Sequence, residues 1–208
     1  MSTTHHLQFP LSKDQVRSLR SGDLIYVSGE IVVTAGLPTH QRILEYLEQN
    51  KPLPIDLSGT ALFHIGSYSH VKDGKFEVLY INPTTSTRFN PYMPKFIRSF
   101  GLCAVGGKGG LDAECTKTMK EVGCVYLSFL GGGCTLLSAA IRDVVTVAWE
   151  DLIPHYRLVK LRVEELGPAT VGIDAHGDSL YDDILGDARA KLPQILAELD
   201  RTRGKVTT

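Results

Sequence analysis

A run of hydroxyl side chains near the middle of the chain ends on an arginine, in the order Thr84-Thr85-Ser86-Thr87-Arg88. A guanidinium has a planar set of donors that matches a carboxylate or a phosphate, and the hydroxyl groups add further donors beside it. The run therefore predicts a binding site for a small anion. A plain Ser/Thr-rich turn before a helix is a common alternative interpretation of the same residues, and it remains open here.

A glycine-rich segment with a single lysine, Gly106-Gly107-Lys108-Gly109-Gly110, lies between a predicted strand and a predicted helix. Glycines let backbone N–H groups converge, the start of a helix adds partial positive charge, and Lys108 adds a full charge. The spacing is not that of a P-loop. We expect this segment to meet the Thr84–Arg88 loop at one sheet edge, where α/β folds bind ligands. The alternative is a flexible connection.

His40 lies in the first turn of a helix that Pro38 is expected to begin. A helix N-terminus lowers the pKa of a histidine and so favours the neutral ring, which can accept a proton. A hydrogen-bonded structural histidine is the more common alternative. Asp174 and His176, two positions apart, either pair with each other or simply form a turn.

Cysteine spacing and charge exclude several classes of protein. No two of the four cysteines have the two-residue separation of a zinc ribbon, a thioredoxin motif or a ferredoxin, and we expect free thiols in a cytoplasmic protein without a signal peptide. The net charge of −1 gives no basic excess for nucleic acid or anionic lipid. The uncharged stretch 122–141 is interrupted by three glycines, so we interpret it as strand, turn and helix rather than as a membrane span.

Strands and helices alternate through the middle of the chain, which predicts the α/β class. The order of elements is expected to bring the two loops together. We expect a loosely held arm over residues 1–20, one domain over 21–200 and a flexible tail over 201–208. The C-terminal segment 180–200 is predicted to be an amphipathic helix, kinked or split before Pro193. The predicted elements are a strand pair or bulged strand at 24–33, a helix from 38, a strand at 61–65, a hairpin around Asp73-Gly74, a helix that Asn90 caps and Gly101 ends, strands at 102–105 and 125–129, a helix between these two strands that Gly123 ends, a helix at 136–141, and strands at 144–149, 158–163 and 170–173.

Taken in order along residues 20–180, these motifs resemble the beta subunit of L(+)-tartrate dehydratase and the C-terminal half of the iron–sulfur (class I) fumarases. The motifs are Gly22-Asp23-Leu24-Ile25-Tyr26, His40-Gln41-Arg42, Pro54-Ile55-Asp56-Leu57-Ser58-Gly59, Pro83-Thr84-Thr85-Ser86-Thr87-Arg88 and Gly106-Gly107-Lys108-Gly109. The resemblance implies a single swivelling β/β/α-type domain with a mixed sheet and flanking helices. It also implies an alpha partner that holds a [4Fe–4S] cluster, in an alpha2beta2 assembly, with no metal on this chain.

The implied reaction is the reversible removal of water from a hydroxy-carboxylic acid. Loss of a proton beside a carboxylate builds negative charge on that carboxylate, so cations fixed there stabilise the transition state. The resemblance assigns substrate binding to Arg88, Lys108 and Thr85, and catalysis to Thr84 as base and His40 as proton carrier or substrate contact. The sequence does not decide which of Thr84 and His40 is the base. A non-catalytic carboxylate-binding module derived from the family is the alternative function.

One departure concerns the far end of the substrate. In the family an Arg-Asp pair precedes the histidine and the arginine binds a carboxylate, whereas this chain has Gly36 and Leu37 there. We therefore expect C4 diacids to be poor substrates, unless Arg42 or the partner supplies the cation. Restoring the pair, Gly36→Arg with Leu37→Asp, is expected to improve the use of malate or tartrate.

Overall fold

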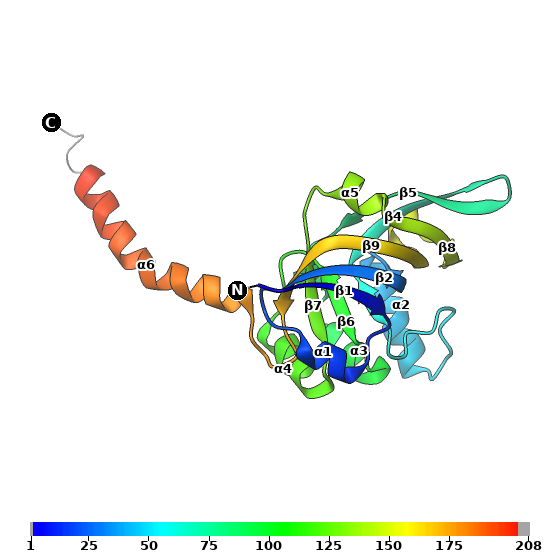
Figure 1. Ribbon diagram of the computed structural model, residues 1–208, viewed down its shortest axis with the longest axis horizontal. Helices are drawn as coiled ribbons and strands as arrows, with labels where there is room; N and C mark the ends of the chain where they lie inside the picture. Colours follow the sequence, from blue (N-terminus) through cyan, green and yellow to red (C-terminus); the bar gives the residue numbers. More distant parts are fainter. Residues whose placement is uncertain (1, 204–208) are drawn as a thin grey trace.

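Seven strands form one mixed sheet in the order β1-β2-β3-β6-β7-β9-β8, in a computed structural model that describes residues 2–203 (Figure 1). Neighbouring strands from β1 to β7 are parallel, and β9 runs antiparallel to β2, β7 and β8. The predicted α/β class with a mixed sheet is therefore confirmed. The strands are β1 Thr4–Phe9, β2 Leu24–Val33, β3 Ala61–Phe63, β6 Ala104–Gly107, β7 Val125–Phe129, β8 Ile141–Ala148 and β9 Leu158–Ile173.

Strand β9 closes the sheet on itself. It pairs with both β7 and β2, so that β2, β3, β6, β7 and β9 form a ring. Two separate strands, at 158–163 and 170–173, were expected here. The structure has one strand of 16 residues instead, with a positive φ of 54° at Glu165 where the register shifts. Pairing with β2 continues across the irregularity, at Val163, Leu166 and Ala169, and holds the backbone extended there.

Residues 2–203 contain six α-helices and two short 3-10 helices. Capping residues set the ends of these helices. At the start of α4 the Asp112 side chain accepts a hydrogen bond from the amide of Cys115, and Gly123 ends that helix with a φ of 76°. Helix α3 starts at Met93, three residues after the expected cap at Asn90, and ends at Gly101 as expected. The helices are α1 Lys13–Ser18, α2 Leu37–Glu48, η1 Ser86–Phe89, α3 Met93–Phe100, α4 Ala113–Val122, α5 Cys134–Ser138, η2 Pro154–Tyr156 and α6 Leu180–Arg203.

The apolar residues divide into two packed clusters, one on each face of the central strands. In β7, Val125, Leu127 and Phe129 belong to one cluster, whereas Tyr126 between them belongs to the other. This alternation is the period of two that a strand buried on both faces produces. The second cluster includes residues of α2, α3 and α4, so these helices cover one face of the sheet.

The first 20 residues do not form the expected arm. Strand β1 pairs in parallel with β2, and Phe9 and Leu19 are buried in the core. Ser12 and Gln15 form a capping box at the start of α1, in which each side chain bonds the backbone of the other residue. Burial of these side chains ties the segment to the sheet. It is part of the domain.

Two elements project from opposite sides of the body (Figure 1). One is the hairpin of β4 Ile65–Lys72 and β5 Lys75–Pro83, which turns at Asp73-Gly74 as predicted, with both residues at positive φ. The other is α6, which runs continuously through Pro193 rather than splitting there. No helix within residues 2–203 is long and apolar enough to span a membrane. The last part of the predicted tail, 204–208, lies outside the described residues.

Candidate active site

The hydroxyl loop and the glycine loop meet as the sequence predicts. The amide of Ser86 donates to the carbonyl of Lys108 at 2.8 Å, and the amide of Lys108 donates to the carbonyl of Thr84 at 3.0 Å. These two bonds make Thr85 and Lys108 an isolated parallel bridge. The amide of Thr84 also donates to the carbonyl of His64 at 2.8 Å. The loops that follow β3, β5 and β6 are therefore fixed to one another by their backbones.

Two cations and two hydroxyl groups share the surface of these loops. The guanidinium of Arg88 donates to Thr84 Oγ1, and Lys108 Nζ donates to Thr85 Oγ1 at 3.2 Å. The two threonines and Lys108 are partly buried, whereas Arg88 is exposed. Neither cation is within ion-pairing distance of a carboxylate among residues 2–203. Both therefore have positive charge available for an anionic ligand.

The glycines of this segment serve close packing rather than an amide cradle at a helix start. A Cβ atom on Gly107 would lie 3.0 Å from the carbonyl of Thr84 and 3.1 Å from His64 Cβ. A Cβ on Gly110 would lie 2.7 Å from the ring of Tyr181. At the start of α4 the amide of Cys115 is already used, since it donates to the carboxylate of Asp112. That amide and the carboxylate beside it do not favour an anion at this helix N-terminus.

His40 lies beneath the loops and has no exposed surface. Its ring stacks on Phe89 with centroids 4.0 Å apart, and its Nδ1 atom lies 2.7 Å from the carbonyl of Gly36. Since a carbonyl only accepts, Nδ1 carries the hydrogen. Burial, ahead of the nearby Arg88, lowers the pKa of His40 to about 4. The neutral ring is as expected, but its main cause is burial rather than the helix start, and the ring does not reach the surface of the two loops.

Sequence reasoning missed a buried hydrogen-bonded group that supports the hydroxyl loop. Ser86 Oγ lies 2.9 Å from His64 Nδ1 and accepts a bond of 2.8 Å from the hydroxyl of Tyr126. All three residues are fully buried. Burial, followed by His40 and Arg88, lowers the pKa of His64 well below its ordinary value. The only sequence signal of His64 and Tyr126 is polarity inside apolar segments, and the fold alone brings them to Ser86.

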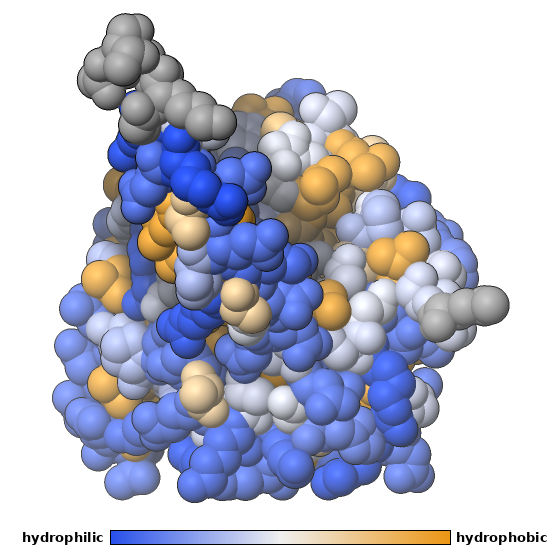
Figure 2. Space-filling model, turned by 90° about the vertical axis from the view of Figure 1, so that its left-hand side faces the viewer, coloured by the Kyte–Doolittle hydropathy of each residue, from blue (hydrophilic) through white to orange (hydrophobic). Residues whose placement is uncertain are grey.

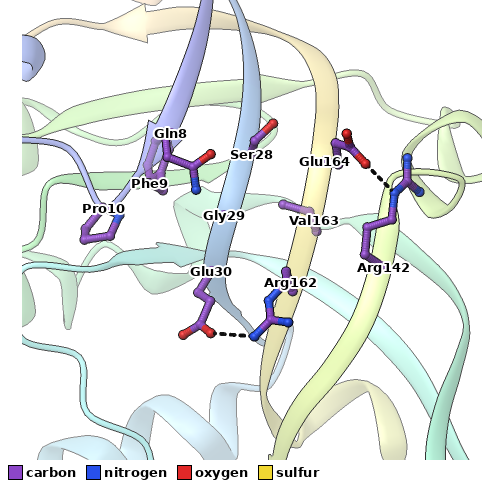
Figure 3. Close-up of a pocket in the computed structure, with 10 residues that line it drawn as sticks. All are labelled: Gln8, Phe9, Pro10, Ser28, Gly29, Glu30, Arg142, Arg162, Val163 and Glu164. Carbon is purple, nitrogen blue, oxygen red and sulfur yellow. Dashed lines mark hydrogen bonds and ion pairs between the residues drawn. The ribbon is translucent and has the colours of Figure 1, made fainter.

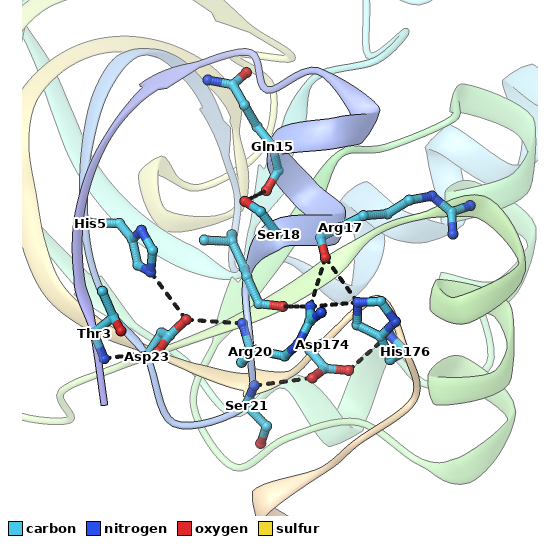
Figure 4. Close-up of polar contacts among 11 residues, drawn as sticks. Thr3, His5, Gln15, Arg17, Ser18, Arg20, Ser21, Asp23, Asp174 and His176 are labelled. Carbon is cyan, nitrogen blue, oxygen red and sulfur yellow. Dashed lines mark hydrogen bonds and ion pairs between the residues drawn. The ribbon is translucent and has the colours of Figure 1, made fainter. Parts of the chain in front are cut away.

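Asp174 and His176 form a structural turn. The Asp174 carboxylate accepts bonds from the amides of Ser21 and His176 at 3.1 and 2.8 Å (Figure 4). It also accepts one from the amide of Asp178 at 3.1 Å. The imidazole of His176 lies 2.6 Å from a guanidinium nitrogen of Arg20, away from the carboxylate. The pair therefore joins the end of β9 to the segment after α1.

A surface pocket with a volume of about 560 Å³ lies elsewhere, between β1, β2, β8 and β9. Its charged residues neutralise one another: Arg162 pairs with Glu30 at 3.3 Å and Arg142 with Glu164 at 2.7 Å (Figure 3). None of the sequence-predicted site residues lines it. It is therefore not the site of the two loops.

The segment around Gly36 is neutral and closely packed. A Cβ on Gly36 would lie 2.7 Å from Tyr156 Cβ and 2.9 Å from Tyr156 Cα, so the space for a larger side chain is occupied. Arg42 does not replace the missing cation, since both of its terminal nitrogens bind Asp151, at 2.9 and 2.7 Å. His155 lies beside Gly66 and its Nε2 atom is 2.9 Å from the hydroxyl of Tyr80.

Comparison with known proteins places the chain in a family. The family model described as "Fumarase C-terminus" matches residues 2–184, so the last 19 described residues of α6 lie outside the match. The chain is 34% identical to a Methanocaldococcus jannaschii protein provisionally named L(+)-tartrate dehydratase subunit beta, over 89% of this chain and 95% of that protein. It is 31% identical to the L(+)-tartrate dehydratase subunit beta of Escherichia coli K12, over 84% and 85%.

A third relative is longer. The chain is 34% identical to a Geobacillus stearothermophilus protein provisionally named class I fumarate hydratase, over 90% of this chain but only 35% of that protein. The predicted resemblance is confirmed by all three proteins and by the family match. This chain belongs to the fumarase C-terminus family.

Proposed function

We propose that this chain is the beta subunit of a two-chain hydro-lyase that reversibly removes water from a hydroxy-carboxylic acid. The names of the relatives favour that class of reaction. The observation that carries the proposal for this chain is the joined pair of loops, in which Arg88 and Lys108 lie beside threonine hydroxyls without a carboxylate partner among residues 2–203. Such an arrangement binds a small carboxylate.

In this proposal Arg88 and Lys108 hold the carboxylate next to the carbon that loses its proton. Negative charge grows on that carboxylate during proton loss, and cations already in place stabilise the transition state more than the ground state. Thr84 is proposed as the base. Its oxygen already accepts a bond from Arg88, and a neighbouring cation favours the alkoxide over the hydroxyl. Thr85, bonded to Lys108, orients the lysine and contacts the substrate.

His40 is proposed to act through its neighbours. It packs on Phe89, next to Arg88 in the chain, and both buried rings, His40 and His64, are neutral because burial lowers their pKa values. Neutral rings leave the positive charge of Arg88 for the ligand. Together with Ser86 they form the support on which the loop rests. His40 is therefore a positioning residue in this proposal.

The iron–sulfur cluster that the family implies is proposed to lie on the alpha partner. Within residues 2–203 no three His, Cys, Asp or Glu side chains gather as a metal site. Cys103, Cys115 and Cys124 are buried, and burial raises their pKa values, which disfavours the thiolate that a cluster needs. The residues of this chain do not fit the cluster, and no step of the reaction is assigned to it here.

The alpha partner is proposed to cover an apolar surface beside the site. Gly131 lies against the stem of Lys108, where a Cβ would be 3.4 Å from Lys108 Cδ. Leu130, on the same loop, and Leu136, in the helix that follows, are 60% and 55% exposed. A site that needs water excluded is completed by covering such a surface. The proposed assembly contains two copies of each chain.

The substrate is proposed to carry fewer charges than a C4 diacid, or to be longer. Gly36, Leu37 and Tyr156 provide no cation, and Arg42 is paired with Asp151. A second carboxylate placed there would lose water without gaining a partner, which is unfavourable.

The test is anaerobic co-expression with the alpha-type chain, followed by dehydration assays on malate, tartrate and longer or less charged hydroxy-acids. We expect a coloured complex that releases water from one of these acids. A chain that stays unpaired, binds carboxylates and shows no turnover in any mixture would instead identify a carboxylate-binding module. Failure of every carboxylate to raise the melting temperature would contradict both functions.

A further inference from the structure

Helix α6 is attached to the body only by its first turn. The hydroxyl of Tyr181 donates to Ser128 Oγ at 2.8 Å, and its ring packs edge-on against Tyr126 with centroids 6.0 Å apart. From Asp182 to Arg203 every residue is exposed, and the helix extends away from the body (Figure 1). The body of the same chain therefore does not cover α6.

Apolar side chains recur along the exposed part of α6 at alternating intervals of three and four residues. We call Leu185, Ala188, Leu192, Ile195 and Leu199 the α6 seam. This is the spacing of the a and d positions of a coiled coil. The three leucines and Ile195 are between 44% and 50% exposed. Figure 2 looks at this side of the molecule, where orange apolar residues are set among blue polar ones.

The two residues of α6 that disfavour helix lie away from this seam. Gly186 and Pro193, which disfavour helix, are seven residues apart and both occupy the outer b position of the heptad. A helix that contains both residues and exposes an apolar stripe is not stable alone in water. The α6 seam therefore needs a second apolar surface to cover it.

We propose that the α6 seam pairs with the α6 seam of a second copy of this chain in a two-helix coiled coil. At least one flanking charge pair attracts in each orientation, and two further flanking residues, Ile184 and Leu196, are exposed and apolar. In a parallel pair, Glu198 at position g lies opposite Arg203 of the second copy at position e. In an antiparallel pair, Lys191 lies opposite Glu198 of the second copy. Because the pair of helices is two-fold symmetric, each of these charge pairs occurs twice. Neither orientation places like charges opposite each other.

The seam begins after the matched family domain ends at residue 184, so this pairing is separate from the surface beside Lys108. The first turn of α6 nevertheless contacts the glycine-rich segment, because Tyr181 packs on Gly110. The coiled coil would thus join two beta subunits at a fixed distance from each site. The inference does not depend on the proposed activity.

The test is the mass of the full chain alone, measured by sedimentation equilibrium between about 5 and 100 µM. We expect a dimer, with twice the 22.8 kDa mass of the chain. Leu192→Glu with Leu199→Glu should halve the measured mass. The matched control, Ala190→Glu with Gln194→Glu, adds the same charge on the outer side of the helix and should remain a dimer. Far-UV circular dichroism checks that the body of each variant is folded.

Three results would overturn the inference. One is a wild-type chain that is monomeric at 100 µM. The second is a seam variant that stays dimeric. The third is hydrogen-exchange protection of 185–199 that arises only when the alpha chain is added, which would make that chain the occupant of the seam.

Discussion

Ser86 and Lys108 are joined by a backbone hydrogen bond of 2.8 Å, although they lie on loops that follow different strands. The same Ser86 bonds His64 and Tyr126 through its side chain. The loop that carries Arg88 is thus fixed to Lys108 by its backbone, and to the buried His64 and Tyr126 by the Ser86 side chain. The backbones that carry the two cations are held relative to each other, which favours the preorganisation that charge stabilisation in a transition state requires.

Removing the hydroxyl of Thr84 tests its proposed role as base. Thr84→Val keeps the shape of the side chain, and we expect kcat of the complex to fall by about 10²- to 10⁴-fold, with a small change in KM because Arg88 and Lys108 remain. Thr84→Ser should retain most activity. Thr87→Val, at an exposed position of the same loop, is the control. Equal kcat values for Thr84→Val and wild type would reassign the base.

Removing the Ser86 hydroxyl tests the buried support. Ser86→Ala leaves His64 and the Tyr126 hydroxyl without their partner, and we expect the free energy of unfolding to fall by about 1–3 kcal/mol. Tyr126→Phe, which leaves the Ser86–His64 bond in place, should lose less, about 0.5–1.5 kcal/mol. Urea titrations measure both. Tyr92→Phe in the same layer is the control, and equal stability of all four proteins would show that the support contributes nothing.

The pH dependence of stability follows from the two buried histidines. Their folded pKa values lie below the unfolded value of 6.5, near 4 for His40. The unfolded chain therefore binds more protons as the pH falls below 6.5, so stability is greatest above that pH. It is lost as the pH falls toward 4, by up to about 1.4 kcal/mol per pH unit for each histidine.

Urea titrations at pH 7.5, 6.0 and 5.0 check this slope. His64→Gln should reduce it, whereas His6→Gln, an exposed histidine bonded to Glu165, should leave it unchanged. Parallel slopes for His64→Gln and wild type would mean that His64 is not buried as a neutral ring.

The structure changes which substitution introduces a cation near the far end of the substrate. The sequence predicts that Gly36→Arg, together with Leu37→Asp, restores a carboxylate clamp. In the structure, however, a Cβ at position 36 would overlap Tyr156. We therefore expect this variant to be destabilised by about 1–3 kcal/mol. Leu37 is 42% exposed and accepts a larger side chain. Leu37→Arg should raise kcat/KM for malate relative to a less charged hydroxy-acid, with Leu37→Gln as the uncharged control. An unchanged ratio would place the far end of the substrate elsewhere.

The two loops could be predicted because their residue types and the alternation of elements are local features. The Asp73-Gly74 turn and the glycine ends of α3 and α4 were predictable for the same reason. His64 and Tyr126 could not be found this way, since each is one polar residue in an apolar strand and the pairing of β3, β6 and β7 alone brings them to Ser86. The prediction of a loosely held arm over residues 1–20 was wrong because burial against β2 decides the structure of this segment. Ser12 and Gln15 were nevertheless a local signal for α1.

The continuity of β9 also depends on pairing with strands that are distant in the sequence. Gly167-Pro168 lies between the two strands predicted from the sequence, yet β2 pairs with β9 before and after it and the segment 158–173 stays extended. The Gly36 environment likewise depends on η2, which follows it by more than 100 positions and fills the space beside it. Such contacts between distant segments cannot be predicted from the spacing of residues in the sequence.

The most direct test of the account is the ratio of kcat/KM values for Lys108→Met and Lys95→Met in the anaerobic complex with the alpha chain. Both substitutions remove one lysine charge, but Lys95 pairs with Glu48 on the helical side of the domain. We predict a loss of at least about 100-fold for Lys108→Met, and one of less than about twofold for Lys95→Met. Equal activity of the two variants would contradict the assignment of the site to the joined loops.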